Sequence, residues 1–187
     1  VFTGMGIGSW GVDTAWADVA PNGWDGTTVS KPSQSEDGIY KISSAAELLW
    51  LANAVNSNKD AEAAYSAQLL CDIDLESHDI RIGSFSNPYK WTFDGNGKVI
   101  KNLKINDTTT TGGVGLFPQL SASAAVKNLG IVNAQVSSGK VLASALSGNC
   151  AGKIESCFVK DSTVSAQAMA GSLCGTLVTN AIMTNCY

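Results

Sequence analysis

The sequence predicts an all-β protein, a right-handed parallel β-helix (solenoid) with one capping α-helix near its amino end. Three observations predict this fold. One pattern of apolar and polar residues recurs between residues 100 and 187, a second apolar element recurs beside it, and a single segment has the apolar spacing of a helix. Repeats this short cannot bury their apolar side chains alone, so we expect them to stack into one continuous core.

The first recurring element has an apolar residue, two mostly polar residues, and then apolar, any and apolar residues. Its copies begin at Ile100, Val126 and Ile154, and a fourth begins at Met183. The third residues of the copies lie 26, 28 and 29 positions apart. We expect them to form a polar ladder at a bend, because Asn tolerates left-handed backbone angles. The expected polar ladder is Asn102, Asn128, Ser156 and Asn185, and the expected inward ladder beside it is Leu103, Leu129, Cys157 and Cys186.

The second element begins at Leu116, Leu142 and Met169, at intervals of 26 and 27 residues. Each repeat therefore contains two or three short strands by this prediction, and neighbouring coils lie ~4.8 Å apart. Small residues let the walls of the coil approach closely. Those expected in this role are Ala143, Ala145, Ala170 and Gly171.

The capping helix is predicted at about residues 44–56, because Ser44 and Glu47 have the spacing of a capping box. Residues 38–187 are expected to form the β-helix, and residues 1–37 an N-terminal arm. Ala15 and Ala17 flank Trp16 in the small-x-small form of a signal-peptidase site. The arm is therefore either an export-signal remnant or a segment that docks on a partner.

Composition excludes several classes of protein. With 187 residues and a net charge of −4, the chain forms one folding unit and lacks the basic cluster that nucleic acid requires. It also lacks the long apolar run of a membrane span. Five cysteines without C-x-x-C spacing and one histidine predict no zinc site, and we expect no cofactor. The sequence does not decide whether one or two disulfides form, and a bridge between Cys157 and Cys186 is one of the possibilities.

Residues 92–105, with the sequence TFDGNGKVIKNLKI, resemble the "TFDGNG…I.NL.I" segment of GLUG-motif and pectate-lyase-like β-helices of bacterial surface proteins. Residues 40–52 resemble the capping segment of that family and residues 72–75 its first coil, so the likeness covers residues 38–187. The resemblance implies an extracellular or cell-surface bacterial setting, which includes adhesins and accessory regions of immunoglobulin A peptidases. It implies no single activity.

An acidic cluster is the strongest candidate for chemistry, and it consists of Asp72, Asp74, Glu76 and Asp79. These carboxylates could bind a hard cation or serve glycoside hydrolysis. A structural role is favoured, because the equivalent positions downstream are Lys, Asn, Ser and Gly. His78 is the only histidine and has no nucleophile elbow beside it, so we interpret it as a surface residue. We assign no catalytic residue and no metal ligand.

Three other groups have a functional and a structural interpretation, and the structural one is favoured each time. Asp94-Gly95-Asn96-Gly97 resembles a calcium loop, but turn chemistry suffices. The aromatic residues could stack against a sugar or pack over the first coil, and packing is favoured. The lysines could form a basic binding stripe or a solvated face, and the solvated face is favoured. The aromatic residues are Trp10, Trp16, Trp24, Trp50, Trp91 and Tyr89, and the lysines are Lys98, Lys101, Lys104 and Lys127.

We therefore predict a non-catalytic extracellular module for adhesion, interaction or surface structure. Its expected partners are a second copy, joined through an open C-terminal coil and the N-terminal arm, or a glycan or host surface protein. One alternative is a filament subunit joined head-to-tail through the arm. The other is a carbohydrate-active enzyme, either a polysaccharide lyase or a hydrolase.

Overall fold

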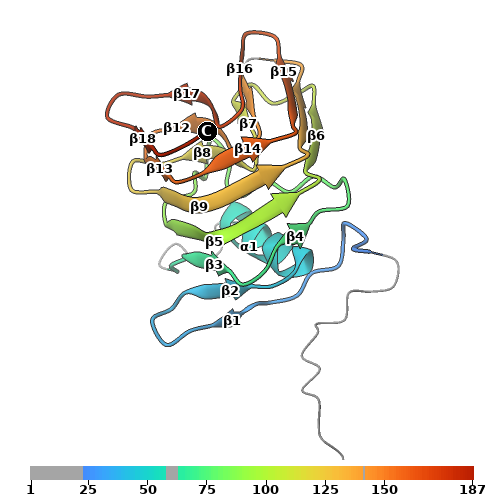
Figure 1. Ribbon diagram of the computed structural model, residues 1–187, viewed down its shortest axis with the longest axis vertical. Coiled ribbons are helices and arrows are strands. Elements are labelled where there is room, and N and C mark those ends of the chain that lie inside the picture. The colour runs from blue at the N-terminus through green and yellow to red at the C-terminus, as the bar shows by residue number, and fades with distance from the viewer. Residues whose placement is uncertain (1–22, 58–62, 141) are drawn as a thin grey trace, which may run out of the picture.

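The computed structural model describes residues 23–57, 63–140 and 142–187. They form a β-solenoid of about five turns with a single helix, which confirms the predicted all-β parallel β-helix (Figure 1). Residues 1–22, and with them most of the expected arm, Trp10 and Trp16, lie outside the described residues. Among the described strands, β1 and β2 pair antiparallel and the other pairs are parallel.

Each full coil passes through four sheets. The largest contains β1 (Ser33–Gln34), β2 (Tyr40–Ile42), β3 (Ala67–Leu69), β4 (Ile73–Asp74), β5 (Thr92–Lys101), β9 (Ala125–Val132), β13 (Lys153–Glu155), β14 (Phe158–Lys160) and β18 (Ile182–Thr184). The second contains β6 (Lys104–Asp107), β10 (Gln135–Ser138) and β15 (Thr163–Ala166). The third contains β7 (Gly113–Val114), β11 (Leu142–Ser144) and β16 (Met169–Gly171). The fourth contains β8 (Phe117–Leu120), β12 (Ser147–Cys150) and β17 (Cys174–Leu177). The expectation of two or three strands per repeat was therefore too low.

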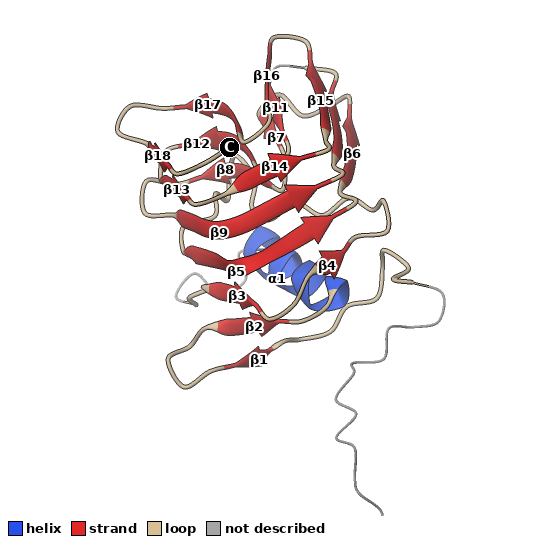
Figure 2. Cartoon of the chain, in the orientation of Figure 1, coloured by secondary structure: helices blue, strands red, loops and turns tan. Residues whose placement is uncertain are grey.

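Helix α1 (Ala45–Ser57) lies beside the first strands of the largest sheet (Figure 2). The capping box predicted it correctly, because the Glu47 N–H donates to Ser44 Oγ at 3.2 Å. The return bond differs by one residue, since Glu47 Oε2 accepts from the Ser43 N–H at 2.6 Å. The apolar face of the helix packs on the core through Ala45, Leu48, Leu51, Ala52 and Val55.

The predicted register of the first element is right for its later copies and wrong for the first. Val126 lies beside Ile154, and Ile154 beside Met183. The residue beside Val126 in the preceding coil is Phe93, whereas Ile100 lies beside Ile131. The reason is that the same apolar pattern occurs twice in a coil, once at each end of the long strand β9. The predicted alignment therefore matched the bend at Asn102 with the bend at Asn128, although these two bends lie at different places in the coil.

Both bends use left-handed backbone angles, as the polar ladder predicted. Asn128, Ser156 and Asn185 have φ angles of 53°, 52° and 53° and form one ladder. Asn102, at 59°, belongs to the other bend and lies beside Asn133, which donates from Nδ2 to Asn102 Oδ1 at 2.6 Å. Leu103 is correspondingly level with Ala134 rather than with Leu129.

The first copy of the second element is shifted in the same way. Leu142 and Met169 are in register as predicted, but the residue beside Leu142 in the preceding coil is Gly113. Leu116 is level with Leu146, because Phe117 pairs with Ser147. Phe117 thus stands where the later copies place a smaller residue.

The small residues predicted that the walls of the coil approach each other closely. This close approach occurs at glycines as well as at alanines. Ala143 and Ala145 are fully buried. A Cβ atom added at Gly148 would lie 2.6 Å from Gly113 Cα, so the third and fourth sheets meet backbone to backbone. No larger residue fits at this contact without a shift of the chain.

Residues 23–37 lie against the first coil. Ser33 pairs with Lys41 across β1 and β2, and the Ser30 N–H donates to Ala46 O at 3.2 Å. This part of the expected arm therefore adds an antiparallel edge strand to the largest sheet.

Candidate functional site

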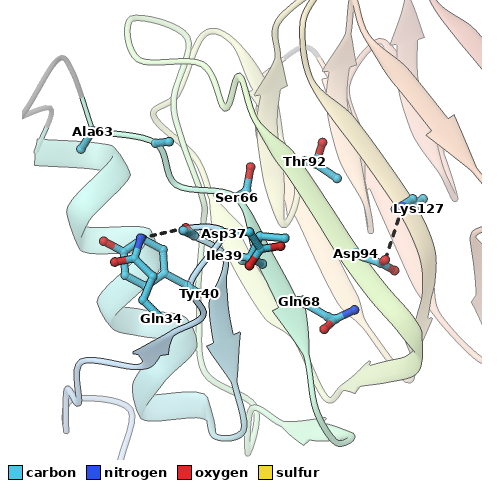
Figure 3. Close-up of a pocket in the computed structure, with 13 residues that line it drawn as sticks. Gln34, Asp37, Ile39, Tyr40, Ala63, Ser66, Gln68, Thr92, Asp94 and Lys127 are labelled. Carbon is cyan, nitrogen blue, oxygen red and sulfur yellow. Dashed lines mark hydrogen bonds and ion pairs between the residues drawn. The ribbon is translucent and has the colours of Figure 1, made fainter.

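A groove with a mixed polar and apolar lining lies on the outer face of the largest sheet, over β2, β3, β5 and β9, and has a volume of about 550 Å³ (Figure 3). One rim is the turn between β1 and β2. The polar residues that line the groove are Gln34, Asp37, Ser66, Gln68, Thr92, Asp94 and Lys127.

Strand alternation builds the groove. Alternate residues of a strand point to opposite faces, so the residues flanking Ala67, Phe93 and Val126, which are buried in the core, face outward. One outward row contains Gln68, Asp94 and Lys127 in register. The other contains small residues, and these leave room above the sheet. The row of small residues is Ser66, Thr92 and Ala125.

Asp94 is the most constrained acid of the groove. It forms an ion pair with Lys127 at 3.4 Å and accepts from the Asn96 N–H at 2.8 Å and from Asn128 Nδ2 at 3.1 Å. Partial burial disfavours the charged form, but these hydrogen bonds and the lysine outweigh it and lower the pKa of Asp94. The carboxylate therefore stays ionised at neutral pH.

Asp37 occupies the rim and is also ionised. Ser35 Oγ donates to Asp37 Oδ1 at 2.5 Å, which lowers the pKa of Asp37. Gln34 Nε2 donates to Gly38 O at 2.8 Å and closes the turn. Lys41 Nζ donates to Gln68 Oε1 at 2.9 Å and fixes the Gln68 amide beside the groove.

The groove thus offers fixed hydrogen-bonding groups rather than an acid and a base. Glycoside hydrolysis normally needs one carboxyl group whose pKa is raised so that it holds a proton, beside another that is ionised. The two groove carboxylates, Asp37 and Asp94, both have lowered pKa values. The arrangement suits binding through hydroxyl, amide and carboxylate groups.

The residues of the acidic cluster bind separate structural partners. Asp72 accepts from the Val99 N–H at 3.1 Å, and Asp74 accepts from Asn102 Nδ2 at 2.7 Å. Asp79 pairs with Arg81 at 2.6 Å. Within residues 23–57, 63–140 and 142–187, no three histidine, cysteine or acidic side chains gather as metal ligands.

His78 is half-buried, and its ring packs edge-on against the ring of Trp24, with 5.4 Å between the ring centroids. The turn at residues 94–97 forms a bulge in β5, where the register shifts between Asp94 and Lys98. Asn96 has a φ of 52°, and its Nδ2 donates to Leu69 O at 3.1 Å. This turn therefore joins neighbouring coils.

The described tryptophans pack on the amino end of the solenoid. Trp50 contacts Tyr40 at 5.0 Å between ring centroids, and Trp91 contacts Tyr89 at 5.6 Å. Tyr89 is fully buried and its hydroxyl donates to Tyr65 O at 2.9 Å. These rings fill the core and its margin, so they present no open aromatic platform.

The four lysines of the expected stripe do not form one basic surface, because two of them are paired with aspartates. Lys101 pairs with Asp72 at 3.3 Å and Lys127 with Asp94, while Lys98 is half-buried and Lys104 exposed. Sequence reasoning placed only Asp94 and Lys127 among the candidates and missed Asp37, Gln34 and Gln68. The signal for Gln68 was the alternation in residues 66–69, which becomes informative only once the register is known. Gln34 and Asp37 belong to β1 and to the turn after it, and no sequence pattern pointed to them.

Comparison with known proteins gives one partial likeness. The chain is 34% identical over 96 residues to halomucin of Haloquadratum walsbyi, a match that covers 51% of this chain and 1% of that protein. The chain thus spans about one hundredth of the length of this relative. No family model matches the chain and no solved structure matches it, so the resemblance to the GLUG-motif family stays a prediction. In the described part of the chain, no helix has the length and apolar character that crossing a bilayer requires.

Proposed function

We propose that this chain is a non-catalytic β-helix module of an extracellular protein, and that its outer groove binds a polyhydroxylated ligand, a glycan. The observation that carries the proposal is the row of amide, carboxylate and lysine side chains that stand in register on β3, β5 and β9, beside a lining that is otherwise largely apolar. Sugars present both hydroxyl groups and apolar ring faces, which match such a mixed lining. Its volume of about 550 Å³ lies within the usual range for ligand sites.

The charge of the groove selects among ligand classes. Lys127 is paired with Asp94, and Lys41 bonds to Gln68, so no cluster of free cations faces a phosphate or sulfate group. A neutral sugar chain can accept hydrogen bonds from lysine and amide groups and donate them to carboxylates.

The test is binding and turnover on a panel of soluble neutral and acidic polysaccharides. We expect Lys127→Ala to weaken binding of a neutral polysaccharide about tenfold and Gln68→Ala severalfold, since a hydrogen bond to a charged group contributes ~1.5–3 kcal/mol and one to a neutral amide ~0.5–1.5 kcal/mol. Gln135→Ala and Lys104→Ala are the matched controls on the second sheet, where both residues are exposed. Unchanged binding in the groove variants contradicts the proposal, and turnover of any polysaccharide contradicts its non-catalytic part.

A second candidate function is self-association through the last coil. Among the strands of residues 23–57, 63–140 and 142–187, β15, β16, β17 and β18 pair with the preceding coil and with no other strand. Met169, Leu177 and Ile182 are 47%, 46% and 43% exposed, and residues 162–187 contain no charged side chain. Exposed edge strands normally carry charges or proline that prevent pairing.

Light scattering over a range of protein concentrations tests this second function. We expect the chain to associate as concentration rises, and Ile182→Lys to remain monomeric, whereas Lys153→Ala on the preceding coil leaves association unchanged. A monomer at all concentrations contradicts it. The participation of residues 1–22, which the filament alternative requires, lies outside the described residues.

A further inference from the structure

Two cysteines occupy the same inward position in the last two coils. Glu155 pairs with Thr184 across β13 and β18, so Cys157 is level with Cys186, two residues further along each chain segment. The Tyr187 N–H donates to Cys157 O at 3.2 Å, which continues the pairing to this level. Neighbouring coils lie ~4.8 Å apart, inside the ~4.4–6.8 Å range of Cα separations that disulfides span.

The two thiols also have the same surroundings. Cys157 Sγ donates to Val126 O at 3.7 Å, and Cys186 Sγ donates to Ile154 O at 3.6 Å. Val126 and Ile154 are themselves in register, so each thiol contacts the equivalent carbonyl of the coil before it. The side chains therefore stack along the solenoid axis, and here both are thiols.

We propose that Cys157 and Cys186 form an inter-coil disulfide when the protein meets a low-molecular-weight disulfide as oxidant. Cys186 is half-buried and Cys157 fully buried, so Cys186 reacts first. Its thiolate attacks the oxidant, forms a mixed disulfide and releases one small thiol. The Cys157 thiolate then attacks the Cys186 sulfur and releases the second small thiol, so two electrons and two protons pass to the oxidant.

The surroundings of Cys157 set the rate of the second step. Burial raises the pKa of Cys157 to about 11, so little thiolate is present at neutral pH. Ring closure should therefore accelerate by about tenfold for each pH unit between pH 7 and 9, because the thiolate fraction rises in that proportion.

The bridge would link the coil that contains β18 to the coil before it. Among the described strands β18 pairs with β13 alone, and the residues before it include the exposed Leu177 and Val178. A link between positions 157 and 186 closes a loop that contains the whole last coil. We expect the closed loop to lower the rate of proteolysis in residues 161–182 at least tenfold.

The experiment oxidises the full chain with glutathione disulfide and maps the cysteines by mass spectrometry of non-reduced peptides. The expected product is a peptide pair linked through Cys157 and Cys186. Cys71→Ser is the control variant, because Cys71 is exposed and lies outside the last two coils. It should leave the linked pair and the protease resistance unchanged, whereas Cys186→Ser should abolish both.

Two results would overturn the inference. One is a chain in which Cys157 stays reduced while Cys186 carries glutathione. The other is a bridge from Cys186 to Cys150 or Cys174. Cys150 and Cys174 lie on another wall of the solenoid, on the paired strands β12 and β17. Because the oxidant is added, the outcome does not depend on the proposed extracellular setting or on glycan binding.

Discussion

At the residue scale, the structure depends on side chains that stabilise left-handed backbone at the bends. Asn102 has a φ of 59° and its amide bonds on both sides, donating to Asp74 and accepting from Asn133. A residue with a Cβ and no polar side chain is strained in this conformation, and glycine is not. Asn102 thus makes two separate contributions to the bend: it tolerates the left-handed backbone conformation, and its side chain forms two hydrogen bonds.

Replacing Asn102 should separate the two contributions. Asn102→Ala loses both hydrogen bonds and keeps the strain, and we expect it to lower the free energy of unfolding by about 2 kcal/mol. Asn102→Gly loses only the hydrogen bonds and should cost about 1 kcal/mol. Urea unfolding measures both values. Equal losses in the two variants would show that backbone conformation contributes nothing at this bend.

A buried carboxylate makes stability depend on pH. Asp107 is 6% exposed and accepts from Arg81 and from the N–H groups of Thr109 and Thr110. Burial opposes ionisation, but these donors outweigh it and lower the pKa of Asp107 well below its usual range. The lowered pKa stabilises the fold above the unfolded-state value of ~3.9, and this stabilisation is lost as the pH falls below it.

We therefore expect Asp107→Asn to destabilise the protein by about 2 kcal/mol at pH 7. The difference from the unsubstituted chain should shrink as the pH falls from about 4 toward 2, because Asp107 of the unfolded chain then takes up a proton while the folded state still holds it as a carboxylate. Thermal unfolding across this range provides the measurement. A difference that stays constant with pH would contradict the account of Asp107.

At the element scale, the sequence predicted the helix and the bends, which depend on residues that are neighbours in the chain. It failed to predict the strand register, which depends on residues far apart in the chain. Ser44 and Glu47 located the helix, and the Asn positions located the bends. The first coil was misaligned because β5 contains a bulge between Asp94 and Lys98, which lengthens that coil and brings a second copy of the motif into frame. The groove was missed for the same reason, since Gln68 and Asp94 become neighbours only through strand pairing.

The contact between the third and fourth sheets gives an element-scale prediction. Gly148→Ala places a methyl group 2.6 Å from the Gly113 backbone, and we expect a loss of about 1–3 kcal/mol in the free energy of unfolding. Gly112→Ala is the matched control, because its added Cβ meets the Phe85 side chain at 3.5 Å, an ordinary contact. Comparable stability of the two variants would mean that the sheets have room to separate.

At the scale of the whole molecule, the solenoid brings four sequence segments together around one groove. Gln68, Asp94 and Lys127 come from successive strands of the largest sheet, and Asp37 comes from the turn before β2, although these residues span about 90 positions in the chain. Because the coils hold these strands in parallel register, the groove is formed by the folded backbone rather than by one loop. A ligand that binds there should contact several coils at once.

Chemical-shift mapping of the isotope-labelled chain during titration with a neutral oligosaccharide tests the central claim most directly. The account predicts that the perturbed backbone amides gather at Ser66, Gln68, Thr92, Asp94 and Lys127, and that amides of the second sheet, such as Gln135, stay unchanged. Saturable perturbations confined to another face, or none across a panel of neutral oligosaccharides, would contradict it.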